Sequence, residues 1–476
     1  MTSSVASSDI FASDFSEDPW WWRDAPPVAY PEHPAAGADV VVVGGGYAGL
    51  SCATEVALAG KSVMVLDVRR VGEGASGRNA GLVSGRAGIS KMIDLEGYVG
   101  PARAAAILDE ADRAYVHFQQ LVADHAPGAF QDRGRFVAAR SPFAFRKLEK
   151  KYREYRDTGE GGSPVELVPP GDEGRFITTD AFHGGMATAD AGLAHPARFV
   201  DGLRRRAEAA GVSLHTGVRV VSVDPGGLPG AVGGTGSGYT VTISVGSGTA
   251  RGHRRIAAGE VVIATNGYTD RAAPWHRERI VPMSSTILAL ERLGPERVES
   301  LLPAMTTVID TNRVIVYARP TPDGDGILFG GRARFRPVST ETSARILHAQ
   351  MLEIFPSLAD VRVTNAWSGL MAFTADYLPK VGRHDDGTWF ALGCNGGSGV
   401  VLMPWLGRAV GRRIAGTDAG GSTSGGGASD GGAGTQLSAL DGLPYERQPL
   451  GRHTSKLIAA AGFWYGLRDR IDNRRP

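Results

Sequence analysis

The chain has 476 residues, of which 21% are charged, and its formal net charge at pH 7 is +1. This length predicts two intertwined domains rather than one simple core. The charge balance argues against a nucleic-acid-binding protein, which would carry a clustered basic excess. The two cysteines, Cys52 and Cys394, lie far apart in the sequence, so a disulfide framework is not expected and a reducing compartment fits.

Neither a membrane-spanning nor a targeting segment is predicted. The sequence has no run of roughly 18 or more apolar residues, and its N-terminus lacks a charged-then-apolar signal pattern. A cytoplasmic location is therefore expected. Clusters of histidine and cysteine at metal-ligand spacing are absent, so no metal is expected. The lone His195, which precedes a proline at a predicted helix start, is interpreted as structural rather than catalytic.

Residues 1–37 are interpreted as an N-terminal arm. Residues 1–18 are small and polar, and we expect them to be disordered or loosely attached. The following Trp20, Trp21 and Trp22 cannot all be exposed at low cost. The simpler interpretation is an arm that packs onto its own chain, and the alternatives are a subunit contact or a lid over an active site.

Two apolar strands joined by a helix follow at residues 38–67. The run 38–43 suits a buried parallel strand because it ends in four consecutive valines. The spacing of apolar residues predicts a helix from Leu50 to about Leu58, which Gly60 ends, and a second strand over 62–66. This strand–helix–strand unit is the context in which a glycine turn binds a dinucleotide.

The glycines at the first turn match the pattern G-x-G-x-x-G. Gly44 allows the tight turn, Gly46 lets a pyrophosphate approach the backbone, and Gly49 lets the helix pack closely on the strand. The helix N-terminus then presents free N–H groups and a partial positive charge to the phosphates. Asp67 stands where a carboxylate would bind a ribose hydroxyl, which favours FAD or NAD over NADP.

A second glycine-rich stretch, Gly72–Gly81, reads Gly-Glu-Gly-Ala-Ser-Gly-Arg-Asn-Ala-Gly. Such a loop can approach a planar ring closely and donate hydrogen bonds to it, for example from Ser76 or Arg78. The preceding Arg69 or Arg70 can approach a pyrophosphate or an adenine. The alternative is a flexible surface loop with a solvated arginine.

The G-x-G-x-x-G turn, the acid and the motif G-x-G-A-S-G-R-N-x-G together resemble the FAD-dependent amine and amino-acid oxidoreductases of the D-amino-acid oxidase superfamily. The sequence is most similar to the γ-glutamylputrescine oxidase branch, with glycine oxidase and sarcosine oxidase as cousins. The resemblance covers about residues 20–416. It implies an α/β fold, α+β overall, in which a Rossmann-like FAD-binding domain is interleaved with a mixed-sheet substrate domain.

Two later segments strengthen this resemblance. Residues 264–269, Ala-Thr-Asn-Gly-Tyr-Thr, are similar to the family's second dinucleotide signature, although alone they are compatible with an ordinary core strand and turn. The glycine-rich loop 394–400 opens a predicted helix that extends to about Ile414. In the family this helix directs its N-terminus at the flavin pyrimidine carbonyls, where its positive end would stabilise the anionic reduced flavin.

The resemblance also predicts how FAD is bound. Val220 is expected near the adenine through its backbone. Binding should be non-covalent, because Met371 stands at about the position where some relatives carry a cysteine that tethers the flavin. The residues expected to bind FAD are Gly44, Gly46, Tyr47, Ala48, Gly49, Asp67, Val68, Arg69, Ala75, Ser76, Arg78, Asn79, Val220, Thr265, Asn266, Gly267, Asn395, Gly396, Gly397, Ser398, Gly399 and Val400.

The expected domain organisation is discontinuous. A C-terminal tail is expected to pack against the body, and a membrane-surface or partner helix is the alternative. The predicted divisions are an arm at 1–37, an FAD-binding domain at 38–100, 190–275 and 365–416, a substrate domain at 101–189 and 276–364, a Gly/Ser-rich linker at 417–442 and a helical tail at 443–476.

The substrate side is expected to come from the middle of the chain. Strands predicted between residues 280 and 332, with a helix over 343–355, would form a mixed sheet over the flavin. Tyr317, Arg319 and Arg332 are candidate substrate contacts. Alternatively, each is a sheet-edge residue paired with water or a carboxylate.

The resemblance implies oxidation of a C–N bond in an amine or amino-acid derivative. The neutral amine would place its α-carbon over flavin N5, a hydride equivalent would pass to the flavin, and the resulting imine would be hydrolysed. Leu328 aligns with a lysine that helps sarcosine oxidases to activate oxygen. Val400 and Val401 stand where those enzymes hold the substrate carboxylate with a lysine, so an amine is a more natural substrate than an N-methyl amino acid.

Three functions remain open at this point. They are an oxidase that passes electrons to oxygen, a dehydrogenase that uses a carrier or quinone, and a non-catalytic FAD-binding subunit of an amine-oxidising complex. A nicotinamide-only dehydrogenase would not explain the segments 264–269 and 394–400. The expected partner is a small-molecule amine or amino-acid derivative, with no nucleic acid, and the sequence leaves an oligomer open.

Overall fold

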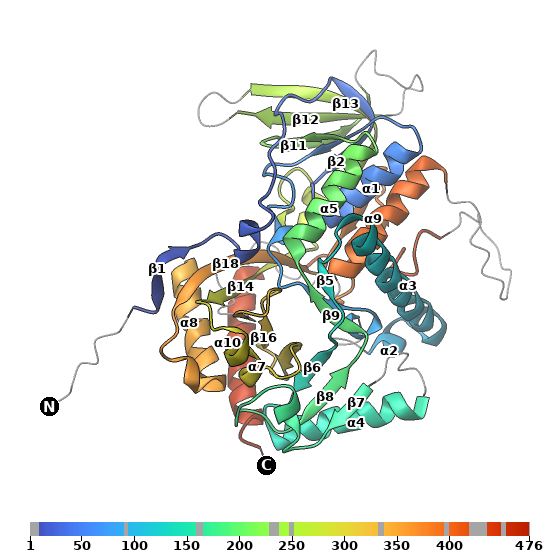
Figure 1. Ribbon diagram of the computed structural model, residues 1–476. Helices are drawn as coiled ribbons and strands as arrows, with labels where there is room; N and C mark the ends of the chain where they lie inside the picture. The colour runs from blue at the N-terminus through green and yellow to red at the C-terminus, as the bar shows by residue number, and fades with distance from the viewer. Residues whose placement is uncertain are drawn as a thin grey trace.

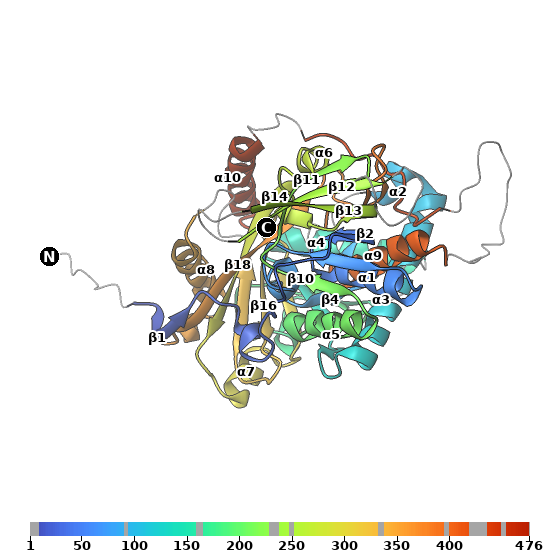
Figure 2. The same ribbon diagram turned by 90° about the horizontal axis from the view of Figure 1, so that it is seen from above.

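The computed structural model describes residues 9–89, 94–158, 165–227, 238–246, 252–331, 338–394, 399–417, 436–448 and 454–475. Within these residues the chain forms two large sheets and a small one, and it passes between the large sheets several times (Figures 1 and 2). None of the helices in these ranges is long and apolar enough to cross a bilayer.

The first large sheet contains β2, the strand that ends at the glycine turn. β2 (Gly37–Val43) pairs in parallel with β3 (Val63–Leu66) on one side and with β13 (Gly252–Ile263) on the other. Its valines are buried, as is typical of a parallel strand covered on both faces. The remaining strands of this sheet are β10 (Ser213–His215), β11 (Arg219–Pro225), β12 (Tyr239–Val245), β19 (Lys380–Arg383) and β20 (Trp389–Leu392).

Four helices gather on one side of this sheet (Figure 1). They share one apolar core with β2 and β3. This packing keeps the N-termini of α1 and α9 close to the ends of β2 and β3. The first of them, like the glycine turn before it, lies close to the predicted bounds. The four are α1 (Tyr47–Leu58), α3 (Pro101–His125), α5 (Pro196–Ala209) and α9 (Gly399–Ala415).

The second large sheet forms the other half. Its outer face is covered by α8 (Thr340–Ile354), which shares an apolar core with the sheet. In order across the sheet, the strands are β1 (Phe11–Ser16), β18 (Val363–Phe373), β14 (Val281–Leu290), β17 (Ile327–Gly331), β16 (Val316–Pro320), β15 (Thr307–Asp310), β6 (Arg135–Ala138), β8 (Gly185–Thr188) and β7 (Val165–Val168).

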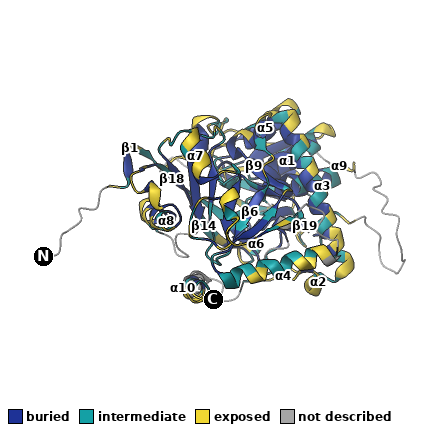
Figure 3. Cartoon of the chain, turned by 60° about the horizontal axis from the view of Figure 1, so that its bottom comes forward, coloured by how far each residue is buried: buried dark blue, intermediate teal, exposed yellow. Residues whose placement is uncertain are grey.

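Short elements complete the fold. A small sheet lies between the two halves and consists of β4 (Leu82–Ser84), β9 (Ala191–Ala194) and β5 (Phe130–Gln131). Strands are mainly buried, whereas the outer faces of α4 and α8 are exposed (Figure 3). The remaining helices are α2 (Leu95–Val99), α4 (Pro142–Thr158), α6 (Pro274–Arg277), α7 (Pro295–Leu301) and α10 (Thr454–Asp472).

The structure differs from the expected division of the chain at three places. Part of the arm expected to be loosely attached forms β1, which pairs in parallel with β18 and buries Phe11. β18 itself pairs with β14, so it belongs to the second sheet rather than to the FAD-binding half. α3, expected on the substrate side, shares its core with α1 and α9. In each case a pairing distant in sequence decides the placement.

The tryptophan arm packs onto its own chain, as the simpler interpretation predicts. Trp20, Trp21 and Trp22 are buried in one cluster with Trp367 and Leu328 of the second sheet. Trp21 is fully buried, and its Nε1 donates to the backbone oxygen of Asn79 at 3.0 Å. The arm therefore holds the glycine-rich loop from the side of the second sheet.

Candidate active site

A cavity of about 340 Å³ lies between the two halves of the molecule. One side is made by the ends of β2 and β3, the first turns of α1 and α9, and the loop 72–80. The opposite side is made by residues of β14, β15, β16 and β18. The cavity therefore connects the glycine turns with the second sheet.

The turn between β2 and α1 has the geometry that its glycines allow. Gly44 has a φ of +110°, in the region that favours glycine. A Cβ on Gly49 would clash with the carbonyl oxygen of Gly44, so the third glycine permits the close helix–turn contact. α1 then begins at Tyr47, and the amide groups of its first turn lack intrahelical acceptors. This end of α1 lines the cavity and can bind an anion.

Asp67 lies at the end of β3, directly beside this turn. Its Oδ2 accepts a hydrogen bond from the Gly45 N–H at 2.7 Å, and its Oδ1 accepts one from the Arg69 N–H at 2.9 Å. Burial raises the pKa of Asp67 to about 6, although both backbone donors act in the opposite direction. Each carboxylate oxygen keeps a second acceptor position, so Asp67 can also accept from a ligand hydroxyl.

The loop 72–81 is shaped by its own polar side chains. Ser76 Oγ accepts from the Tyr47 N–H at 3.1 Å, which ties the loop to the start of α1. The Asn79 amide donates to the carbonyl oxygens of Ala75 and Ser76, at 3.1 and 2.8 Å. Arg78 Nε donates to the Glu73 carbonyl oxygen at 2.7 Å, and burial lowers the pKa of Arg78.

Asn266, in the turn 264–269, forms hydrogen bonds to the end of β20, directly before the glycine-rich segment 394–400. It has a φ of +45°, and its Oδ1 accepts from the N–H groups of Gly393 and Cys394 at 3.0 and 3.1 Å. The neighbouring Gly267 lies against β18, where an added Cβ would stand 2.9 Å from the carbonyl oxygens of Leu370 and Met371. The turn 264–269 therefore holds both Gly393–Cys394, at the end of β20, and β18.

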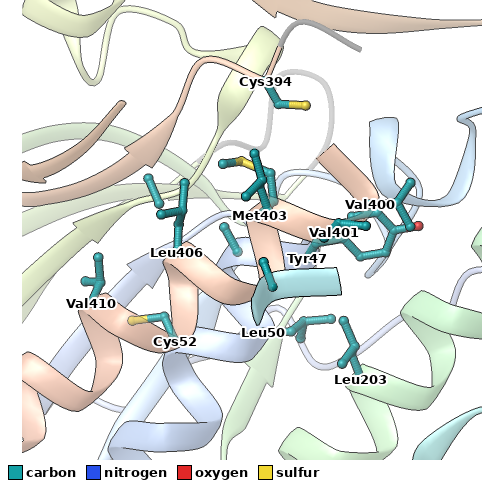
Figure 4. Close-up of a cluster of buried hydrophobic side chains, with 14 of the residues drawn as sticks. Tyr47, Leu50, Cys52, Leu203, Cys394, Val400, Val401, Met403, Leu406 and Val410 are labelled. Carbon is teal, nitrogen blue, oxygen red and sulfur yellow. The ribbon is translucent and has the colours of Figure 1, made fainter. Parts of the chain in front are cut away.

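α9 begins beside α1 and directs its first turn at the cavity, which Gly399, Val400 and Met403 line. Further along, Gly407 and Gly411 face α1, where an added Cβ would clash with the carbonyl oxygens of Ala48 and Cys52. Figure 4 shows the side chains of the core between the two helices. The N-termini of two long helices thus meet one cavity, and both favour negative charge there.

The wall from the second sheet is largely apolar. It is lined by Ile287, Ile309, Ile315 and Met371, with Ser285 and Tyr317 as the polar side chains. Tyr317 is partly buried, and this desolvation raises its pKa, so the phenol stays protonated. A neutral hydroxyl on an apolar wall can donate to or accept from a small polar group.

A family model described as FAD dependent oxidoreductase, DAO, matches residues 39–413. The chain belongs to this family of FAD-dependent oxidoreductases. The matched range includes the glycine turn 44–49, the segments 264–269 and 394–400, Asp67 and the strands that form the apolar wall of the cavity. The D-amino-acid oxidase resemblance inferred from the motifs is confirmed, and so is the enzyme class.

Known relatives match almost the whole length of this oxidoreductase. A probable oxidoreductase OrdL of Rhizobium meliloti (strain 1021) is 29% identical over 443 residues, 91% of this chain and 92% of the relative. The γ-glutamylputrescine oxidoreductase of Escherichia coli (strain K12) is 29% identical over 442 residues, 91% of this chain and 93% of the relative.

Solved structures share the fold. The glycine oxidase of Geobacillus kaustophilus superposes with a TM-score of 0.62 at 21% sequence identity, covering 80% of this chain and 95% of that one. The L-proline dehydrogenase of P. horikoshii gives a TM-score of 0.59 at 19% identity, covering 81% and 94%. The expected fold, a Rossmann-like FAD-binding half interleaved with a mixed-sheet half, is confirmed.

The residues around the cavity fit FAD. The first turn of α1 with Ser76 would hold the pyrophosphate, and an added Cβ on Gly46 would stand only 2.8 Å from Ser76 Oγ, so glycine keeps the cradle open. Asp67 would accept from a ribose hydroxyl, and Val220, which lines the cavity, would lie beside the adenine. The start of α9 and Met371 would lie beside the flavin ring.

Most predicted cofactor residues line this cavity. Gly49 and Gly267 do not; they provide close backbone contacts instead. Asn395, Gly396, Gly397 and Ser398 lie outside the described residues. Those that line the cavity are Gly44, Gly46, Tyr47, Ala48, Asp67, Val68, Arg69, Ala75, Ser76, Arg78, Asn79, Val220, Thr265, Asn266, Gly399 and Val400.

The three candidate substrate contacts are placed differently from one another. Tyr317 lines the cavity. Arg319 does not line the cavity, contrary to the prediction that it contacts the substrate. Its guanidinium is buried and donates to the carbonyl oxygens of Ala80 and Ala194, both at 2.8 Å. Its neighbours explain this, because Trp21 and the loop backbone surround it. Arg332 lies outside the described residues.

Other predicted positions and some additional ones are now located. His195 caps α5 by accepting from the Arg198 N–H at 3.2 Å, and burial lowers its pKa to about 4, so the structural interpretation is confirmed.

Ile309 and Ile315 line the cavity but were not predicted. Alternation along β15 and β16 would have placed them on the face of Tyr317. Groups of side chains able to bind a metal do not occur among the described residues.

Proposed function

We propose that this protein oxidises the C–N bond of an amine or amino-acid derivative to an imine, which water then hydrolyses. When bound, FAD would supply the electron-accepting chemistry. The observation that carries the proposal is the apolar wall of isoleucines, Met371 and a protonated Tyr317 opposite the cofactor side. Burial on such a wall disfavours an ammonium ion, so a substrate amine loses its proton and presents its lone pair.

Relatives support an amine as the substrate. One relative is named for γ-glutamylputrescine, a compound that carries a primary amine. In this chain the two valines Val400 and Val401 are buried at the start of α9 and offer no charge to a carboxylate beside the flavin. The positive end of α9 faces the same part of the cavity and favours negative charge on the cofactor side.

We propose oxygen as the electron acceptor. A dehydrogenase that uses a carrier or quinone is the second candidate, and one observation favours it. Leu328, at the position where sarcosine oxidases carry the lysine, is fully buried in the tryptophan cluster. Among the described residues that line the cavity there is no lysine. The two candidates predict different products from the same substrate.

The test is the visible spectrum of the purified protein during anaerobic addition of γ-glutamylputrescine, putrescine and a panel of amino acids. Bleaching of the flavin bands by one compound supports the proposed oxidation and identifies its substrate class. Readmission of air then separates the acceptors. Rapid recolouring with stoichiometric peroxide supports oxygen, whereas slow recolouring supports another acceptor. Failure of every amine and amino acid to bleach the flavin contradicts the proposal.

We further propose that FAD is held without a covalent bond, because Met371 lines the cavity at the position of the tether. Acid precipitation of the protein should then leave all of the yellow cofactor in the supernatant. Yellow protein in the pellet would contradict this.

A further inference from the structure

Arg135 on β6 is a buried cation with few hydrogen-bond acceptors around it among the described residues. Its residue is 7% exposed, and in the described ranges no carboxylate forms an ion pair with it. A guanidinium has five N–H donors, yet Arg135 makes a single side-chain hydrogen bond, from Nη1 to Ser84 Oγ at 3.4 Å. Its Nε is buried without a partner. Burying a charge in this way is costly unless an anion completes the site.

Arg319, two strands away in the same sheet, shows what a satisfied buried arginine looks like in this protein. Its Nη1 donates to the carbonyl oxygens of Ala80 and Ala194, and its Nε donates to that of Pro320 at 3.1 Å. Arg319 thus makes three hydrogen bonds to the chain, whereas Arg135 makes one among the described residues. The difference indicates that Arg135 is kept for a group that does not belong to the chain.

The register of the second sheet places Arg135 on the face of the sheet that carries the cavity wall, although Arg135 itself does not line the cavity. β6 and β15 pair in parallel, with Val137 opposite Ile309 and Arg135 opposite Thr307. Side chains two residues apart share a face of a strand, and paired residues share it as well. Because Ile309 lines the cavity, Arg135 and Thr307 stand on the same face, one pair further along.

The strand β4 also connects the cavity with Arg135. Leu82 of β4 lines the cavity, and Ser84, two residues on, is the hydrogen-bond partner of Arg135. The guanidinium therefore lies beyond Ile309 and Leu82. Thr307 Oγ1 is also buried there without a partner. Guanidinium N–H groups with two hydroxyl groups are a donor set that suits a carboxylate.

We propose that Arg135, with Ser84 and Thr307, binds a carboxylate of the substrate beyond Ile309 and Leu82. This inference rests on the proposed amine oxidation and narrows its substrate class. The substrate is an amine whose carboxylate is several bonds away from the reacting nitrogen. Such a molecule keeps its neutral amine on the apolar wall while its anion neutralises the buried arginine.

The kinetic test compares γ-glutamylputrescine, which has a remote carboxylate, with putrescine, which has none. In Arg135→Met, KM for γ-glutamylputrescine should rise about 10- to 100-fold, the loss expected for a charged hydrogen bond. KM for putrescine should stay within about twofold, and kcat for both should change little. Arg135→Lys should recover part of the loss. An equal change in KM for both amines would overturn the proposal.

Thermal unfolding separates a binding role from a structural one. Removing an unpaired buried charge should leave the melting temperature of the ligand-free holoenzyme unchanged or higher. Arg319→Met is the matched control, and it should lower the melting temperature because three carbonyl oxygens lose their donor. A drop in Arg135→Met as large as that in Arg319→Met would make Arg135 a structural residue and refute the site.

Glutarate distinguishes this inference from the proposed function, because its binding needs no turnover. The wild-type holoenzyme should show a saturable change in its flavin spectrum with glutarate, and Arg135→Met should weaken that binding about 10- to 100-fold. If no amine is oxidised but glutarate binds in this way, the proposed function fails and the carboxylate site stands. If glutarate binds both proteins equally, or neither, the carboxylate site fails.

Discussion

Asp67 is held ready by the turn that it supports. Two backbone N–H groups fix its carboxylate, and burial raises its pKa to about 6, so near neutral pH it is mainly ionised and available to a ribose. The same carboxylate therefore organises the glycine turn and would also complete the proposed nucleotide site.

Asp67→Ala is expected to weaken FAD binding by about 1.5–3 kcal/mol, the amount typical of a lost charged hydrogen bond. The measurement is the dissociation constant of FAD for the apoprotein by fluorescence quenching. Asp39→Ala is the control, because Asp39 accepts from Ser62 at the opposite end of β2. It should lower stability without changing FAD affinity. Unchanged affinity in Asp67→Ala would show that the carboxylate does not hold the ribose.

Asp310 is the second carboxylate whose burial has a measurable consequence. Its Oδ1 accepts from the Val316 N–H at 3.1 Å, while Arg140 Nε stands 3.8 Å from its Oδ2. Burial raises its pKa from the usual 3.8 of an aspartate to about 7. Because the folded-state pKa is the higher one, folding is favoured by the protonated form, and stability is lost as pH rises from about 3.8 to about 7.

Asp310→Asn keeps an acceptor for Val316 and removes this titration. The variant should therefore unfold at a higher temperature than the wild type at pH 8, and the difference should be clearly smaller at pH 5 and nearly vanish only as the pH approaches 3.8. Other acidic groups titrate in both proteins and cancel in the comparison. Melting curves at the two pH values provide the measurement. A difference that is the same at both would mean that Asp310 does not titrate in this range.

Among the elements, the crossing of α1 and α9 determines where two helix N-termini lie. Gly407 and Gly411 allow the axes to approach, and the apolar side chains shown in Figure 4 fill the space around them. A wider crossing would move the start of α9 away from the cavity. The two glycines therefore affect the cofactor site from its far side.

Gly407→Ala should place a methyl group on the Ala48 carbonyl oxygen and destabilise the protein by about 1–3 kcal/mol, as overpacking does. It should also lower FAD retention, measured as the flavin-to-protein absorbance ratio after gel filtration. Gly466→Ala in α10 is the matched control, because an added Cβ there meets no atom within 4 Å. It should be neutral or stabilising by up to about 1 kcal/mol. Equal retention in both variants would disprove the expected coupling.

Short sequence patterns were enough to predict the nucleotide-binding half. The prediction was less accurate where the structure depends on contacts between residues far apart in the sequence. The turn at Gly44–Gly49, Asp67 and the start of α9 are encoded within short stretches, and the structure places them at one cavity. β1 was missed because its pairing partner begins at Val363, far along the chain. Arg319 looked like a substrate contact because its sequence does not show that Trp21 and distant carbonyl groups surround it.

For the whole molecule, the C-terminal segment ties the two halves together. Glu110 of α3 accepts from Trp405 Nε1 at 2.8 Å and from the Ala439 N–H at 2.7 Å, which fixes the segment 436–448 on the FAD-binding half. α10 then reaches the second sheet, at the turn between β15 and β16. The tail is thus part of the enzyme body, as the simpler interpretation of it predicts.

Asp469 is the residue through which α10 holds that turn. Its carboxylate accepts from the backbone N–H groups of Arg313 and Val314, at 3.1 and 3.0 Å, and from Arg313 Nη1 at 3.0 Å. Ile315, the next residue, lines the cavity, and Tyr317 follows on the same face. The last helix therefore supports the apolar wall of the cavity, although Asp469 and Val314 are 155 residues apart in sequence.

Asp469→Ala should loosen this wall without affecting the FAD site. Losing two backbone partners and one charged partner should cost about 1–3 kcal/mol in local stability, so deuterium exchange across residues 311–317 should speed up. KM for the substrate should rise while FAD retention stays the same. Asp360→Ala is the control, because Asp360 forms an exposed pair with Arg297 away from the cavity. Unchanged exchange at 311–317 would show that β15 and β16 hold the turn without α10, and the tail would then only cover the body.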